Sequence, residues 1–157
     1  MPPGHERFMR DALDEAARGG AEGNFAVGSV VVGGDAVVAR GRNLEASTGD
    51  PTTHAEVVAV REACRALGRR DLAGHALYTT FEPCPMCLGA IMASGIGTLV
   101  LGARHDPRTS RWGPFAVERL LDLAAWGERL RVVTGVLPDE CRAVRQEWDA
   151  RTTRRTP

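Results

Sequence analysis

The chain has 157 residues, which suits one domain with its own core, and 43% of them are hydrophobic. This composition excludes a disordered or fibrous protein. Its 20 acidic and 20 basic residues cancel. That balance argues against a general nucleic-acid binder, because such proteins usually carry a strong positive excess.

The sequence also predicts where the protein resides. No stretch approaches 18 consecutive uncharged apolar residues, so no membrane span is expected. The first 20 residues mix acids and bases and lack the apolar segment of a secretory signal peptide. We therefore expect a cytoplasmic protein in which residues 1–157 form a single domain, with residues 151–157 as a frayed tail.

The first half of the chain alternates between helix and strand patterns. Apolar residues at helical spacing predict a helix over 5–18. Two Val-rich segments, 26–32 and 36–43, flank Gly-Gly-Asp and predict a hairpin. Residues 44–51 are interpreted as a polar loop, and residues 53–67 as a helix.

The second half continues the alternation. We expect strands at 76–80, 98–102 and 130–136, helices at 84–94, 115–125 and 138–152, and an irregular loop over 103–114. Interleaved strands and helices predict a layered α/β domain around one sheet. The hairpin makes that sheet mixed and not purely parallel.

Three residues have the side chains that zinc prefers, namely His54, Cys84 and Cys87. The two cysteines are three apart at a predicted helix start, so their side chains share one face. The N–H groups at that helix end favour negative charge and therefore the thiolate form. The sequence thus predicts one Zn²⁺ per chain.

The number of ligands predicts a catalytic zinc site and not a structural one. A structural zinc site usually has four protein ligands, whereas a catalytic one leaves a position for water. With three ligands, the sequence predicts a zinc-bound water whose pKa falls to about 7. Glu56, two residues after His54, could accept the water's proton and pass it to a substrate.

Each feature also has a simpler interpretation. Glu56 fits a capping box that begins at Thr53. Cys84 and Cys87 alone could form a redox pair. The other histidines, His5, His75 and His105, are interpreted as ordinary core or surface residues. The conjunction of His-Ala-Glu at one helix start with Pro-Cys-Pro-Met-Cys at another favours the metal site.

The remaining cysteines, Cys64 and Cys141, lie alone in helical patterns and are interpreted as small buried hydrophobic residues. If either one were a fourth ligand, the site would be closed. The chain would then be a zinc-stabilised binding module without catalysis, which is a remote alternative.

The motif His54-Ala55-Glu56 with Pro83-Cys84-Pro85-Met86-Cys87 resembles the signature of zinc nucleobase deaminases. The chain is similar to the cytidine deaminase-like superfamily, in its branch of guanine deaminases and tRNA adenosine deaminases, over about residues 6–150. The resemblance implies a three-layer α-β-α fold with a central five-stranded mixed sheet, and usually a homodimer.

The resemblance also implies roles for particular residues. Zinc would be bound by His54, Cys84 and Cys87, with Glu56 as the proton shuttle. Asn43, at the end of the second strand, would hydrogen-bond the substrate, and Ala55 would be a further substrate-binding residue. Phe25 looks like the position on which the base stacks. Strand capping by Asn43 and core packing by Phe25 are the simpler interpretations.

The two branches differ in substrate. Residues 85–91 are similar to guanine deaminases, whereas residues 135–141 look more like the tRNA enzymes. Residues 105–112 depart from the pattern of the tRNA enzymes. This loop is expected near the mouth of the pocket, so Asp106 and Trp112 are candidate pocket residues. Neutral net charge also weakens the case for RNA. We therefore predict hydrolytic deamination of a free nucleobase or nucleoside, purine-like, with a tRNA wobble adenosine deaminase as the alternative.

Overall fold

The computed structural model describes residues 4–153. The helices are α1 (Gly4–Ala21), α2 (Glu45–Thr48), α3 (Ala55–Leu67), α4 (Pro85–Ala93), α5 (Val117–Leu123) and α6 (Pro138–Thr153). The strands are β1 (Gly28–Gly33), β2 (Ala36–Arg42), β3 (His75–Phe81), β4 (Thr98–Ala103) and β5 (Arg131–Val133). No helix within these described residues is long and apolar enough to cross a membrane.

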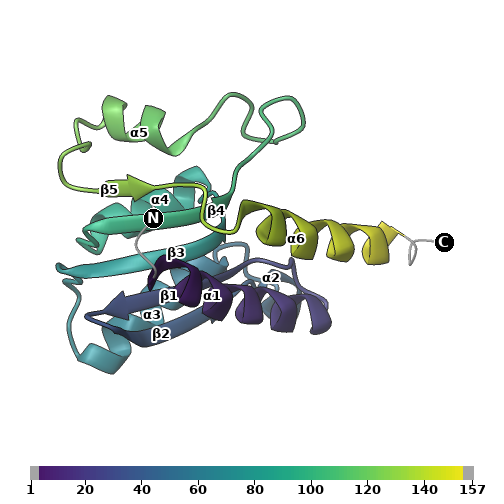
Figure 1. Cartoon of the computed structure of the whole chain (residues 1–157), viewed down its shortest axis with the longest axis horizontal. Coiled ribbons are helices and arrows are strands. Elements are labelled where there is room, and N and C mark those ends of the chain that lie inside the picture. The colour runs from purple at the N-terminus through teal and green to yellow at the C-terminus, as the bar shows by residue number, and fades with distance from the viewer. Residues whose placement is uncertain (1–3, 154–157) are drawn as a thin grey trace.

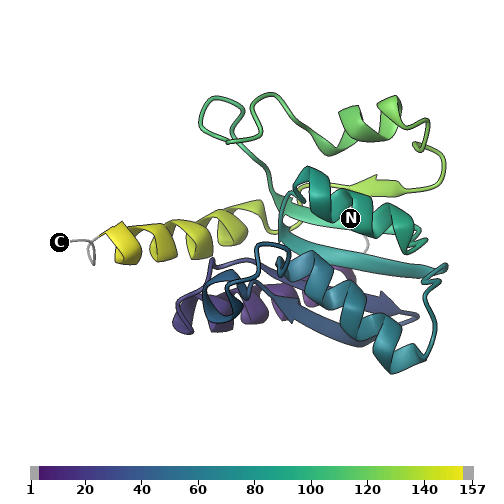
Figure 2. The same cartoon turned by 180° about the vertical axis from the view of Figure 1, so that it is seen from behind.

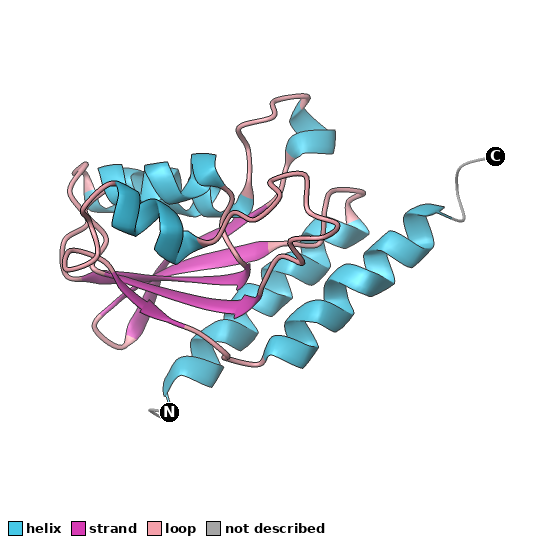
Figure 3. Ribbon diagram, turned by 90° about the horizontal axis from the view of Figure 1, so that it is seen from above, coloured by secondary structure: helices cyan, strands magenta, loops and turns pink. Residues whose placement is uncertain are grey.

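The five strands form one mixed sheet in the order β2-β1-β3-β4-β5. Strand β1 is antiparallel to both β2 and β3, while β3, β4 and β5 run parallel to one another. Helices α1 and α6 cover one face, and α3 and α4 cover the other (Figures 1 and 2). Figure 3 shows the sheet between these two helical layers, which confirms the predicted three-layer architecture.

Two predicted segments were wrong in detail. The polar loop expected over 44–51 contains helix α2, one turn stabilised where the Asn43 side chain accepts a hydrogen bond from the Glu45 N–H. A four-residue turn is too short to show a periodic pattern. The strand expected over 130–136 ends at Val133, because Gly135 and Leu137 adopt positive φ angles of 75° and 50° and turn the chain into α6.

Other differences lie at element ends. Helices α1 and α6 extend beyond the predicted ranges, so residues 151–153 are helical and not a frayed tail, while residues 154–157 lie outside the described residues. Cys141 is buried as predicted, but Cys64 is only partly buried at the edge of the core.

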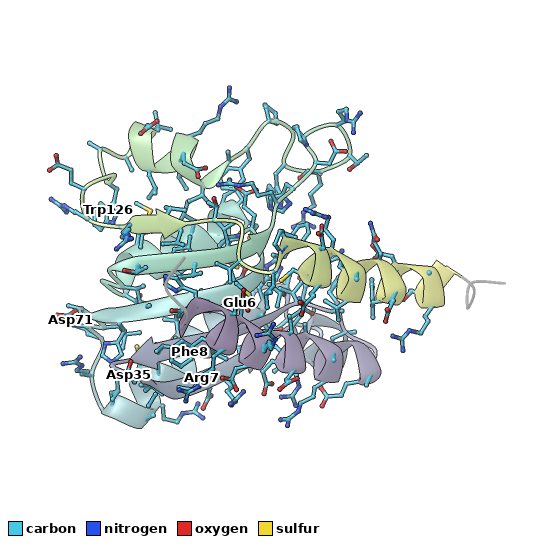
Figure 4. All side chains as sticks on the ribbon, in the orientation of Figure 1. Glu6, Arg7, Phe8, Asp35, Asp71 and Trp126 are labelled. Atoms are coloured by element: carbon cyan, nitrogen blue, oxygen red, sulfur yellow. The ribbon has the colours of Figure 1, made fainter. Side chains whose placement is uncertain are left out.

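The carboxyl ends of β2, β3 and β4 lie at the same end of the sheet. The opposite edge holds the β1–β2 turn, with Asp35, and the approach to β3, with Asp71. Figure 4 labels both residues at the left, away from the free end of α6. The starts of α3 and α4 therefore meet at the edge where β2, β3 and β4 end.

Gly41 on β2 lets helix α3 approach the sheet closely. A Cβ atom at this position would overlap the Ala55 carbonyl oxygen and the Ala59 backbone nitrogen. Only a residue without a side chain allows the first turn of α3 to lie this close to β2. That first turn carries His54 and Glu56, so a backbone contact sets the position of both.

We expect Gly41→Ala to destabilise the protein by about 1–3 kcal/mol, because the added methyl group forces α3 away from the sheet. Urea unfolding measures this loss. Gly97→Ala is the matched control, since a Cβ at Gly97 meets nothing within 4 Å. Equal stabilities of the two variants would show that the close approach is unimportant.

Candidate metal centre and active site

His54, Cys84 and Cys87 converge although 30 residues separate the histidine from the first cysteine. The His54 Nδ1 atom lies 3.6 Å from the Cys84 sulfur and 3.4 Å from the Cys87 sulfur, and the two sulfurs are 3.6 Å apart. A tetrahedral zinc ion with usual bond lengths separates such ligand atoms by roughly 3.5–3.8 Å. The three residues therefore fit one zinc ion.

The ligand group contains three residues. Among the residues that the structure describes, His54, Cys84 and Cys87 are the His, Cys, Asp or Glu residues grouped closely enough to hold a metal. Neither Cys64 nor Cys141 belongs to this group. The binding-module alternative consequently lacks the fourth protein ligand that it requires.

Local backbone geometry explains the convergence. His54 and Cys84 are the N-cap residues of α3 and α4, and both have extended backbone angles. Pro85 follows in the first helical position of α4, where proline is well tolerated. Cys87 then lies one turn into α4 on the same side as Cys84. Both ligand segments are thus held at helix N-termini, which favour the thiolate form.

Protons compete with a metal for these ligands. The hydrogen bond between Cys84 and Cys87 lowers the pKa of Cys84 to about 4, and the hydrogen bond of Cys84 with His54 adds to the effect. The hydrogen bond to the Cys84 sulfur raises the pKa of His54 to about 9. The hydrogen bond between Cys84 and Cys87, together with burial, raises the pKa of Cys87. Zinc binding therefore releases protons from His54 and Cys87.

Glu45 orients the metal-facing imidazole. Its Oε1 atom lies 2.8 Å from His54 Nε2, and both side chains are largely buried. A carboxylate at this distance accepts a hydrogen bond from Nε2–H, so the Nδ1 atom carries a lone pair that faces the sulfurs. The sequence did not reveal this residue, because α2 was expected to be an irregular loop.

Glu56 lies buried beside the three ligands, with 4% of its surface exposed. The Thr79 hydroxyl lies 3.2 Å from its Oε1 atom. Burial is the largest influence on this carboxyl and raises its pKa. The capping-box interpretation is wrong, because α3 begins at Ala55 with His54 as N-cap, and no side chain caps that helix end.

A second buried carboxylate, Glu82, has a structural role. It accepts hydrogen bonds from the Arg104 guanidinium at 2.9 Å and from the backbone N–H groups of His105 and Val117, each at 3.1 Å. These bonds tie both ends of the 104–117 loop to the end of β3. Its position just before Pro83 and Cys84 was the one sequence signal for this residue. Its hydrogen-bond partners could not be predicted, because they are distant in the chain.

A cavity of about 590 Å³ opens above Glu56. All the predicted site residues except Cys87, which is fully buried, line this cavity. Those lining residues are Phe25, Asn43, His54, Ala55, Glu56, Cys84, Asp106 and Trp112. The size is that of small-molecule sites, in which a few polar groups converge between apolar walls.

Asn43 and Ala55 lie in the inner part of the site. The Asn43 Oδ1 atom accepts the Glu45 N–H at 3.1 Å, so the simpler interpretation of a turn residue holds for that atom. Its Nδ2 group donates to no residue that the structure describes. Ala55 is fully buried at the start of α3. Asn43 therefore has a donor available to a ligand.

Phe25 belongs to an aromatic wall built with helix α6. Its ring centre lies 4.7 Å from that of Trp148, and the Arg145 guanidinium carbon lies 4.8 Å above it. Phe25 is 37% exposed, so the core-packing interpretation is wrong. The sequence did not single out Arg145 or Trp148, because only the docking of α6 against α1 brings them to Phe25.

Asp106 and Trp112 line the outer part of the cavity, and each has a charged partner. Three hydrogen bonds from Arg108 hold the Asp106 carboxylate and lower its pKa to about 2. The Arg111 guanidinium carbon lies 4.4 Å from the Trp112 ring centre. The loop thus presents an ion pair and a covered indole at the cavity.

A three-layer fold with a His-Cys-Cys group beside a buried glutamate defines the class of zinc-dependent hydrolytic deaminases. A family model described as the cytidine and deoxycytidylate deaminase zinc-binding region matches residues 2–103. The chain belongs to this family and is a zinc-dependent deaminase.

Relatives in the family have two kinds of substrate. The chain is 38% identical to the tRNA-specific adenosine deaminase of Bacillus subtilis (strain 168), covering 87% of this chain and 83% of that protein. It is 43% identical to the guanine deaminase of the same organism, covering 64% and 65%. The solved guanine deaminase of Nitrosomonas europaea superposes with a TM-score of 0.81 at 29% identity, covering 92% and 84%.

We expect Glu45→Ala to weaken zinc affinity by about 10- to 100-fold, because His54 would lose the partner that fixes its orientation. Competition with a coloured chelator measures the affinity. Glu62→Ala, which removes a carboxylate from the exposed side of α3, is the control and should bind zinc normally. Unchanged zinc affinity in Glu45→Ala would contradict the orienting role.

Proposed function

We propose that this protein hydrolytically deaminates a free nucleobase or nucleoside, purine-like, with guanine or an analogue as the main candidate, and releases ammonia. The observation that carries the proposal is the position of Glu56. This buried carboxyl lines a cavity of small-molecule size and interacts with His54, Cys84 and Cys87.

Each inner residue has a role in this proposal. Zinc held by the three ligands would acidify water and so supply hydroxide at neutral pH. Glu56 takes up the proton that the water loses and delivers it to a ring nitrogen of the base. After the carbon–oxygen bond has formed, Glu56 takes the remaining proton from the added hydroxyl group and transfers it to the amino group. The carbon–nitrogen bond then breaks, the carbonyl forms and ammonia leaves. Asn43 Nδ2 donates a hydrogen bond that orients the base.

Burial of Glu56 suits this double role. A carboxyl whose pKa is raised above its ordinary value holds a proton more readily than an exposed one. It can therefore act first as base and then as acid within one turnover. The Thr79 hydroxyl, 3.2 Å away, holds one of its oxygens in place.

The cavity walls support a small substrate. Phe25 and Arg145 line one wall, with Trp148 packed against Phe25, and the 104–117 loop supplies Trp112. A planar base fits between such apolar surfaces. The chain has no net charge, whereas binding to a polynucleotide draws much of its affinity from many phosphate contacts.

The second candidate is a tRNA wobble adenosine deaminase. Its support is the 38% identity to a tRNA-specific adenosine deaminase over 87% of this chain. Four arginines among the described residues line the cavity, and three of them, Arg111, Arg142 and Arg145, could contact phosphates of an RNA. The chemistry at Glu56 would be the same for both substrates.

An ammonia-release screen tests the proposal. The zinc-loaded protein is incubated with guanine, adenine, cytosine, their nucleosides and a tRNA anticodon stem-loop. We expect the fastest release from a free purine or its nucleoside. Release from the stem-loop alone would support the second candidate and overturn the small-molecule proposal.

Glu56→Gln is the inactive reference for the screen. The amide has nearly the same shape but cannot carry the proton, so we expect bound zinc to remain while turnover falls by at least about 100-fold. Glu62→Gln, on the exposed side of the same helix, should keep full activity. Substantial turnover by Glu56→Gln would refute the proton-shuttle role.

We also propose that the protein is a homodimer. Helix α4 contains no charged residue, and its outer side includes Gly89 and Ala93, both exposed. An uncharged exposed helix side is a favourable surface for a second copy. Light scattering should then give a mass of twice 16.9 kDa, and a mass of 16.9 kDa would contradict the proposal.

A further inference from the structure

His105 lies in the cavity wall directly after strand β4. Its backbone N–H donates to Glu82 at 3.1 Å, so the buried Glu82 carboxylate fixes its position. Its ring meets Phe81 edge-on, with centres 5.0 Å apart, and Phe115 at 6.3 Å. The imidazole is therefore held rigidly by contacts that leave its nitrogens unused.

Neither ring nitrogen of His105 has a hydrogen-bond partner among residues 4–153. The Nε2 atom is sealed from solvent, whereas Nδ1 is not. A buried polar atom without a partner costs about 1–3 kcal/mol, so Nε2 adds no stability here, and Nδ1 is the ring nitrogen left open to a ligand. Simple core packing of His105, as the sequence suggested, would favour an apolar residue here.

The protonation of His105 follows from its surroundings. Burial lowers the pKa of the imidazole, so the ring is neutral at pH 7 and carries one N–H. A sealed N–H without an acceptor is rarer than a sealed lone pair. The tautomer that leaves the lone pair on Nε2 places the proton on Nδ1, the accessible nitrogen.

We propose that His105 is a substrate-binding residue that determines specificity, by donating its Nδ1 proton to an acceptor atom of the base. The inference rests on the proposed function, because the cavity is the one above Glu56. The recognised group is a carbonyl oxygen or an unprotonated ring nitrogen. Asn43 Nδ2 provides a second donor in the same cavity. Two donors from separate elements select bases that carry two acceptors.

His105→Phe separates binding from stability. Phenylalanine fills the space between Phe81 and Phe115 but cannot donate. Replacing an unpaired buried nitrogen by an apolar ring should leave the melting temperature unchanged or raise it. We expect the dissociation constant for guanine, measured by calorimetry in the Glu56→Gln protein, to rise about tenfold. A core-packing role would lower stability and leave binding unchanged.

Two further variants sharpen the test. His105→Asn keeps an N–H donor and should recover part of the affinity for guanine. His75→Phe changes a histidine at the opposite edge of the sheet, where Nδ1 already contacts the Leu72 carbonyl oxygen at 3.1 Å, and should leave affinity unchanged. Wild-type affinity of His105→Phe for guanine, adenine and cytosine alike would overturn the inference.

A direct readout does not depend on turnover. We expect the nitrogen signals of the His105 ring to shift when guanine, adenine or cytosine is titrated into protein with isotope-labelled histidine. If the ammonia-release screen fails but one of these bases binds through His105, the proposed reaction is wrong and the inference stands. If the screen succeeds while the His105 signals stay fixed with all three bases, the inference is wrong and the reaction stands.

Discussion

The site depends on two helices that start at the same edge of one sheet. Helix α3 can reach that edge because Gly41 has no side chain between β2 and the first turn of α3. Helix α4 begins there because Pro85 starts it directly after Cys84. A displacement of either helix by about 1 Å would separate three ligand atoms that now lie 3.4–3.6 Å apart.

The two buried carboxylates near the cavity, Glu82 and Glu56, have different surroundings. Glu82 accepts three hydrogen bonds, from Arg104, His105 and Val117, and is therefore fully engaged in holding the cavity loop. Glu56 has the Thr79 hydroxyl near one oxygen and is otherwise buried, which raises its pKa. The three bonds to Glu82 hold the loop in place, whereas burial with few hydrogen bonds favours the protonated form of Glu56.

The cavity is built by both halves of the chain. The inner half comes from the segment around Asn43, His54 and Cys84, which the family model covers, and it carries the groups needed for deamination. The outer half comes from His105, the loop after it and helix α6, which lie beyond the matched residues 2–103. The cavity therefore combines a segment that the family model matches with segments that lie outside that match.

The sequence by itself determined the zinc ligands as a chemical set and the mixed sheet, because residue types at helix starts and alternating patterns are local properties. Its motifs also gave the class of reaction, through their resemblance to a known family. It misassigned α2, a turn too short for a pattern, and the end of β5, where two positive φ angles redirect the chain. Only the tertiary structure decided that Glu45 orients His54, that Trp148 covers Phe25 and that His105 lines the cavity. The Glu45–His54 contact spans nine residues and depends on a turn that no periodic pattern predicts. The other two depend on segments far apart in the chain, whose meeting is fixed by the packing of helices on the sheet.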